Sequence, residues 1–142
     1  MKYKEEILEG FFLKRYKRFF ADIKIDNKIV TAYCPNTGSL LGLLNENSKA
    51  LIAKVDNPNA KLKFRLEAIK SNKTFVGINT SLPNGIVFEA ISKKEILTDL
   101  KGILKKEVKY GKNSRIDIFV NNPDGKDSYV EIKSVTLSRS KQ

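Results

Sequence analysis

The first 80 residues contain several short segments in which apolar and polar residues alternate, and turn-forming residues separate these segments. Alternation with a period of two is typical of β-strands, because successive side chains point to opposite faces. Strands are expected at residues 11–25, 29–33, 50–55, 61–69 and 74–80. Turns are expected at Asn27–Lys28, at 34–38 (CPNTG) and at 57–60 (NPNA). Five or so short strands of this kind predict a small β-barrel, for which the OB type is the best match.

The pattern changes after residue 82. Pro83 is expected to open a helix that runs to about Ile91. The SKKE segment at 92–95 matches a capping box and predicts a second helix that ends at Gly102. Three further strands are expected at 107–111, 114–121 and 128–135. The chain is therefore expected to form two domains, an OB-like β-barrel at 1–82 and an α/β domain at 83–142.

The chain contains no histidine and a single cysteine, Cys34. An intramolecular disulfide, a Cys/His zinc finger and serine or cysteine catalysis that depends on histidine are therefore excluded. Carboxylates, lysines, hydroxyls and hard, oxygen-liganded cations such as Mg²⁺ remain for chemistry. There is no apolar run of membrane-spanning length, and acidic residues stand where a signal peptide would need its apolar segment. A cytoplasmic protein with no membrane partner is expected.

The net charge is +11 and is spread over the chain. Basic residues outnumber acidic ones by 15 to 8 in residues 1–83 and by 12 to 8 in residues 84–142. Such a charge indicates a polyanionic partner, with nucleic acid first. Compositional drift is the alternative, because lysine outnumbers arginine by 22 to 5.

Basic and aromatic residues interleave between residues 13 and 20. On a continuous strand, one face would carry Lys14, Tyr16 and Arg18, and the other would carry Arg15, Lys17 and Phe19. Such faces suit phosphate contacts and base stacking, although an amphipathic strand with solvated cations explains them as well. The remaining candidates for nucleic-acid contacts are Asn36 and Thr37 in the CPNTG loop and Arg115. Backbone amides of that loop could hold a phosphate, but a tight connection is the simpler interpretation.

Acidic residues in the second half form the candidate catalytic site. Asp117 is expected on one strand, and Glu131 and Lys133 two apart on the next, so their side chains would converge. The two carboxylates would hold Mg²⁺, and Lys133 would orient a water or neutralise developing charge. Glu107 and Glu89 are candidate outer ligands. A structural ion pair is the alternative, because Glu-x-Lys also occurs by chance in a lysine-rich chain.

Asp117 followed by Glu-x-Lys on the next strand resembles the PD-(D/E)XK nuclease-like pattern. Longer segments resemble the sugar fermentation stimulation protein A family: LKRYKRFFADI, CPNTGSL, INTSLPN with EAI, EVKYGKNSRIDIF and YVEIKSVTL. The resemblance implies an N-terminal OB-like domain, a C-terminal PD-(D/E)XK nuclease-like domain, DNA binding and a link to the regulation of sugar-utilisation genes. It places Asp117, Glu131 and Lys133 at the nuclease-like positions.

Members of this family continue beyond the SVTL segment with a further helix and strand, whereas this chain stops at Gln142. The nuclease-like domain is therefore expected to be partial, with an exposed apolar patch or a homo-oligomer at its uncovered face. A non-catalytic DNA- or RNA-binding OB protein is the alternative function.

Overall fold

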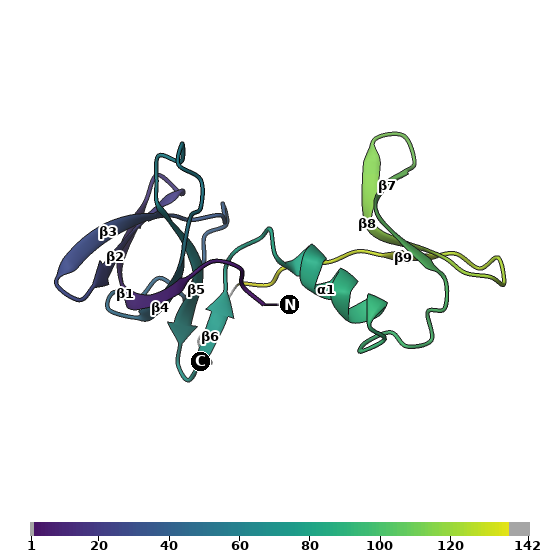
Figure 1. Cartoon of the computed structure of the whole chain (residues 1–142), viewed down its shortest axis with the longest axis horizontal. Coiled ribbons are helices and arrows are strands. Elements are labelled where there is room, and N and C mark those ends of the chain that lie inside the picture. The colour runs from purple at the N-terminus through teal and green to yellow at the C-terminus, as the bar shows by residue number, and fades with distance from the viewer. Residues whose placement is uncertain (1, 137–142) are drawn as a thin grey trace. The chain divides into compact units, whose positions relative to one another are not determined.

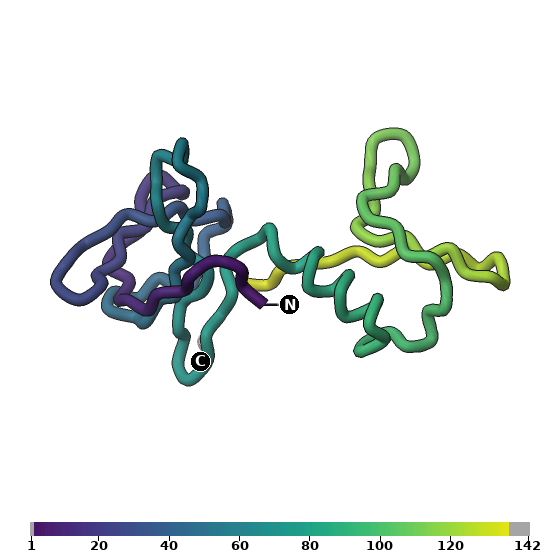
Figure 2. The backbone as a smooth tube through the Cα atoms, in the orientation of Figure 1, coloured from purple at the N-terminus to yellow at the C-terminus, as the bar shows by residue number. Residues whose placement is uncertain are grey.

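The computed structural model describes residues 2–136, which form two compact units at Lys2–Thr80 and Ser81–Ser134 (Figure 1). The backbone trace in Figure 2 follows the chain from one unit to the next. Six strands form the first unit: β1 (Ile7–Tyr16), β2 (Phe20–Ile25), β3 (Lys28–Tyr33), β4 (Lys49–Lys54), β5 (Phe64–Ser71) and β6 (Thr74–Gly77).

The first unit is a closed barrel of five strands. The order is β3-β2-β1-β4-β5, and a parallel pairing between β3 and β5 closes the sheet. β1 therefore pairs with both β2 and β4, and β6 extends the sheet beyond β5. Buried apolar residues of these strands, including Phe12, Ile23, Ile52, Leu66 and Ile69, fill the interior. The predicted OB-like barrel is confirmed.

The prediction of one strand from 11 to 25 is wrong. The chain turns between β1 and β2, with Lys17 and Arg18 in the left-handed region at φ 48° and 62°. Phe19 N donates to Lys17 O within this turn. Arg18 therefore does not share a strand face with Lys14 and Tyr16. The turn contains none of the glycine, proline or asparagine residues by which a turn is usually predicted from sequence.

The second unit contains one helix, α1 (Pro83–Ser92), as predicted from Pro83. The second predicted helix is wrong, because the chain turns after Ser92. Ser92 Oγ donates back to Phe88 O at 2.7 Å instead of capping a new helix. Lys94 and Leu97 then adopt positive φ, which interrupts any helix. Among the described residues, no helix has the length and apolar character to cross a membrane.

Three antiparallel strands follow: β7 (Ile103–Tyr110), β8 (Ser114–Asn121) and β9 (Ser128–Val130). Ile118 and Val120 of β8 pack with Ile91 of α1 in a small core. β9 is shorter than predicted, so Glu131 and Lys133 lie just beyond a strand rather than on it. The reason is that Ile132 N donates to the Asp117 carboxylate at 2.7 Å, where a longer strand would use a backbone carbonyl.

Candidate nucleic-acid interface and carboxylates of the second unit

The outer surface of β1, β2 and β3 consists of three rows of side chains, set by the strand register. We call these nine residues the β1–β3 face. The first row is Tyr16, Phe20 and Tyr33; the second is Lys14, Asp22 and Thr31; the third is Phe11, Lys24 and Ile29. Intervening residues such as Ala21 and Ile23 point into the core and are fully buried.

Aromatic rings dominate the first row. Tyr16 stacks on Phe20 with ring centroids 5.5 Å apart, and Tyr33 stacks on Phe19 at 6.3 Å. Tyr16, Phe19 and Tyr33 remain 38%, 41% and 41% exposed. Lys14 lies over the Tyr16 ring at 5.7 Å from its centroid. Exposed rings next to exposed cations form a surface on which bases can stack while ammonium groups contact phosphates.

Lys17 and Arg18 lie in the exposed turn beside this row. Their backbone conformation differs from the predicted one, but both cations still flank the aromatic rings in sequence and in the fold. Phe19 was expected on a strand face with Arg15 and Lys17, but it follows the turn and stacks on Tyr33 instead. Phe20 and Tyr33 were missed, because the turn that aligns them with Tyr16 was not predicted.

Two predicted contact residues hold the CPNTG loop in place instead of facing solvent. Arg15 donates to the carbonyls of Arg18, Asn36 and Gly38, at 2.8, 2.5 and 2.7 Å. Asn36 is 6% exposed; its amide donates to Ile78 O, and its side-chain oxygen accepts from Gly38 N. Thr37 is exposed at the loop tip. The loop is thus a tight connection, and we assign Arg15 and Asn36 a positioning role.

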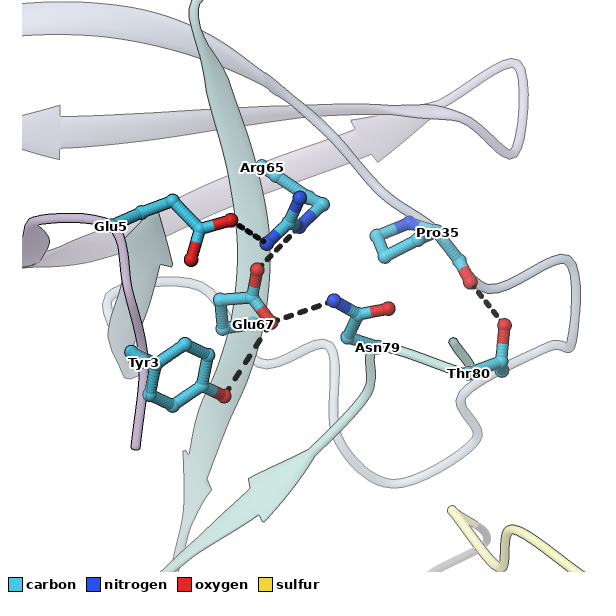
Figure 3. A network of polar contacts seen from close by, with 7 residues as sticks. All are labelled: Tyr3, Glu5, Pro35, Arg65, Glu67, Asn79 and Thr80. Atoms are coloured by element: carbon cyan, nitrogen blue, oxygen red, sulfur yellow. Dashed lines mark hydrogen bonds and ion pairs between the residues drawn. The ribbon is translucent and has the colours of Figure 1, made fainter. Parts of the chain in front are cut away.

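A buried polar network supports the barrel and had no counterpart in the sequence prediction (Figure 3). Glu67 on β5 is only 1% exposed. It accepts from Arg65 Nε at 2.5 Å and from Asn79 Nδ2 at 2.8 Å, and the Tyr3 hydroxyl lies at 3.5 Å. Arg65 also pairs with Glu5 at 3.3 Å. The network therefore ties the segment before β1 and the segment after β6 to β5.

The packing around Glu67 changes the pKa values of Tyr3 and Arg65. Burial raises the pKa of Tyr3, and the neighbouring Glu67 charge raises it further. Burial opposes the charge of Arg65, but the hydrogen bond and charge of Glu67 outweigh that effect and raise the pKa of the guanidinium. The Arg65 cation is thus fixed in place as the partner of a buried carboxylate.

Three carboxylates of the second unit, those of Glu107, Asp117 and Glu131, belong to β7, to β8 and to the segment that follows β9. The register of β7 and β8 pairs Lys106 with Ile118 and Val108 with Ile116, and the regular pairing is interrupted between them, at Glu107 and Asp117. Glu131 directly follows Val130, the last residue of β9, which pairs with Ile118. Asp117 Oδ1 accepts from Asn84 of α1 at 2.8 Å, and Oδ2 accepts from Ile132 N. The Asp117 carboxylate is therefore oriented by the helix and by the segment after β9.

Lys133 pairs with Glu131. The hydrogen bond and charge of Glu131, with a smaller contribution from Asp117, raise the pKa of Lys133 above its ordinary value. The group therefore remains an ammonium at neutral pH, which suits charge neutralisation and not proton abstraction. The contact between Lys133 and Glu131 also agrees with the alternative interpretation of the sequence, a structural ion pair.

The remaining predicted residues of the second unit lie apart from this pair. Glu107 is exposed and has a positive φ of 53°. Glu89 accepts from Lys93 one helical turn away at 2.5 Å, which lowers the pKa of its carboxyl group. Arg115 is exposed on β8, opposite Lys109. Within residues 2–136, no three histidine, cysteine or acidic side chains converge closely enough to hold a metal.

Asp117 and Glu131 nevertheless provide carboxylate oxygens, which are the type of ligand that Mg²⁺ prefers. Protein-bound Mg²⁺ commonly uses one or two carboxylates and keeps several waters. Each carboxylate has about four acceptor positions, so the hydrogen bonds to Asp117 and the ion pair of Glu131 leave lone pairs for a cation. These two carboxylates are thus suitable ligands for a hard cation.

Two family models match the chain. The one described as SfsA N-terminal OB domain matches residues 13–78, and the one described as Sugar fermentation stimulation protein RE domain matches residues 81–142. Two curated relatives, sugar fermentation stimulation protein homologs of Synechocystis sp. and Pelagibacter ubique, are each 43% identical. These matches cover 95% and 100% of this chain. The chain spans 59% and 61% of the length of those relatives.

A solved structure also matches, described as the structure of Pyrococcus furiosus SfsA in complex with Ca²⁺. Its TM-score is 0.71 and its sequence identity 29%. The match covers 94% of this chain and 57% of that one.

Proposed function

This chain belongs to the sugar fermentation stimulation protein family, and from that premise we propose that it binds DNA as a single strand on the β1–β3 face. The observation that carries the proposal is the aromatic row of Tyr16, Phe20 and Tyr33, with Tyr16, Tyr33 and the adjacent Phe19 exposed, next to Lys14 and the Lys17–Arg18 turn. Stacking is tolerant of sequence because every base has a π-face. We propose further that binding takes place in the cytoplasm and contributes to the regulation of sugar-utilisation genes.

The chemistry of the face favours a single strand over a duplex. Bases in a duplex are already stacked on one another, whereas an unpaired base offers its ring to a tyrosine or phenylalanine. The net charge of +11 adds attraction to phosphates over the whole chain. RNA shares this chemistry, and an oligoribonucleotide of the same sequence distinguishes it from DNA in each experiment below.

Binding is expected to weaken steeply with salt. The Lys17→Gln, Arg18→Gln double variant should reduce the slope of log K against log salt by about 1.4, since each phosphate contact on a single strand contributes about 0.7. Fluorescence anisotropy of a labelled ten-nucleotide strand at several salt concentrations measures this slope.

The matched control is Lys61→Gln with Lys73→Gln, which removes two exposed cations from other loops of the barrel. It should leave the slope within error of the parent chain. Equal slopes for both double variants would show that the turn between β1 and β2 does not contact the strand.

As a second function, we propose a nuclease-like Mg²⁺ site in the second unit, supported by the carboxylates of Asp117 on β8 and Glu131 just after β9. The Pyrococcus furiosus protein was solved with Ca²⁺, another hard cation that prefers oxygen ligands. Asp117 and Glu131 would hold the ion, and Asn84 would keep Asp117 oriented. A bound Mg²⁺ supplies polarisation of a phosphate and activation of a water. Lys133, held as an ammonium, would neutralise negative charge that develops on the phosphate.

Replacing Asp117 by asparagine should weaken Mn²⁺ binding by on the order of tenfold or more, since it removes a charged ligand. Electron paramagnetic resonance of free Mn²⁺ measures the affinity without any need for turnover. Asp124→Asn, in the exposed turn between β8 and β9, is the control and should bind as the parent does. Equal Mn²⁺ affinity in the parent and in Asp117→Asn would eliminate the site.

Magnesium-dependent cleavage of DNA should be lost in Asp117→Ala and in Lys133→Ala while DNA binding is retained.

A further inference from the structure

Asp22 is the one carboxylate among the nine residues of the β1–β3 face. It lies in the middle row on the middle strand, between Lys14 of β1 and Thr31 of β3. The aromatic row flanks it on one side, and Phe11, Lys24 and Ile29 flank it on the other. A negative charge in this position repels phosphates. A carboxylate at the centre of a nucleic-acid-binding surface therefore requires another explanation.

The hydrogen bonds of Asp22 fix its orientation but occupy only one of its oxygens. Thr31 Oγ1 donates to Oδ1 at 2.8 Å, and the Tyr16 hydroxyl donates to the same oxygen at 3.3 Å. Oδ2 faces Lys14 Nζ at 3.8 Å, which is beyond hydrogen-bond distance. The Asp22 side chain is 15% exposed and that of Lys14 is 71% exposed. The carboxylate is therefore held in place, is reachable from solvent and retains acceptor capacity on Oδ2.

The Tyr16 ring and Asp22 act as a pair. The hydroxyl of Tyr16 binds Asp22, so the ring that would stack a base and the acceptor beside it are fixed relative to each other. A base stacked on this ring would have its edge, and not its face, close to the carboxylate. Unpaired bases are commonly recognised in this way, by stacking together with hydrogen bonds to the Watson–Crick edge.

We propose that Asp22 reads the Watson–Crick edge of a base stacked on Tyr16 and thereby selects guanine. The inference rests on the proposed binding of a single strand to this face. Guanine presents two adjacent donors, N1–H and N2–H, both of which Asp22 Oδ2 can accept through its two lone pairs. Adenine and cytosine present one amino group beside an acceptor nitrogen, and thymine presents one N–H between two carbonyls. Their acceptors would face a negative charge, so these bases bind less well beside Asp22.

The test uses four labelled ten-nucleotide strands, one of thymine alone and three with a single central guanine, adenine or cytosine. In anisotropy titrations, the strand with guanine should bind about tenfold more tightly than the all-thymine strand, equivalent to about 1.4 kcal/mol. Asp22→Asn should abolish this preference. It should bind the all-thymine strand more tightly than the parent chain does, because the repulsion between the Asp22 carboxylate and the phosphates is gone.

Two further variants separate base reading from a purely structural role. Thr31→Val removes the stronger of the two bonds that orient Asp22, so it should reduce the ratio of the affinity for the guanine strand to that for the all-thymine strand. Asp56→Asn removes an exposed carboxylate between β4 and β5 and should keep the full preference. Thermal unfolding of each variant verifies that the barrel is intact.

Equal binding of all four strands by the parent chain would overturn the inference and leave the proposed function standing. A guanine preference that persists in Asp22→Asn would overturn it equally. Failure of the parent chain to bind any of the strands would overturn the proposed function and this inference together.

Discussion

Replacing Glu67 by alanine should lower the free energy of unfolding of the barrel unit by about 3 kcal/mol. The substitution leaves the Arg65 guanidinium, whose side chain is only 25% exposed, without its closest carboxylate. It also removes the acceptor of Asn79 and Tyr3 and opens a cavity on β5. For a unit of this size, the melting temperature should fall by on the order of 10–20 °C. Circular dichroism during thermal and urea unfolding measures both quantities.

The control for this prediction is Glu6→Ala, which breaks the exposed pair between Glu6 and Lys54. Its effect should stay within about 0.5 kcal/mol, because exposed ion pairs contribute little. The double variant Arg65→Met, Glu67→Leu should recover most of the loss, since an apolar pair leaves no charge uncompensated. If Glu67→Ala melts at the same temperature as Glu6→Ala, the network does not stabilise the barrel.

Replacing both Tyr16 and Tyr33 by alanine should weaken binding of a single DNA strand by on the order of 100-fold or more. Each substitution removes one exposed ring from the aromatic row, and base–ring stacking contributes about 1–3 kcal/mol per base. The remaining rings, Phe19 and Phe20, also lose their stacking partners. Anisotropy titration at fixed low salt gives the affinity, because salt changes the electrostatic contribution independently.

Phe75→Ala is the matched control for the aromatic row. Phe75 is an aromatic residue of the same unit, on β6, with 37% of its surface exposed, close to the 38% of Tyr16. Its removal should leave the affinity unchanged. An equal loss of affinity in Phe75→Ala and in the double tyrosine variant would indicate a non-specific effect of lost apolar surface.

The barrel was predictable because its strands alternate and its turns use asparagine, proline and glycine. The turn between β1 and β2 was not predictable, because Lys17 and Arg18 adopt positive φ in a run of residues that favours strands. That error also misaligned the binding surface. With the turn in place, Tyr16 and Tyr33 fall in one row with Phe20, which a continuous strand does not allow.

Tertiary contacts account for the other differences. Asp117 was correctly predicted on a strand, but its carboxylate binds Ile132 N, and the strand expected to carry Glu131 and Lys133 ends at Val130. Glu67 occupies a polar position of an alternating segment and would be expected in solvent. It is buried because Tyr3 and Asn79, distant in sequence, cover it. Spacing alone contains no information on such contacts.

The location of the bound strand tests the central claim most directly. A ten-nucleotide strand that carries 5-iododeoxyuridine forms covalent links to aromatic residues stacked on the modified base when it is irradiated, and peptide mass spectrometry identifies the residue. The β1–β3 face predicts links to Tyr16, Phe19, Phe20 or Tyr33. Links confined to Phe75, or to Tyr110 and Tyr129 of the second unit, would contradict the account.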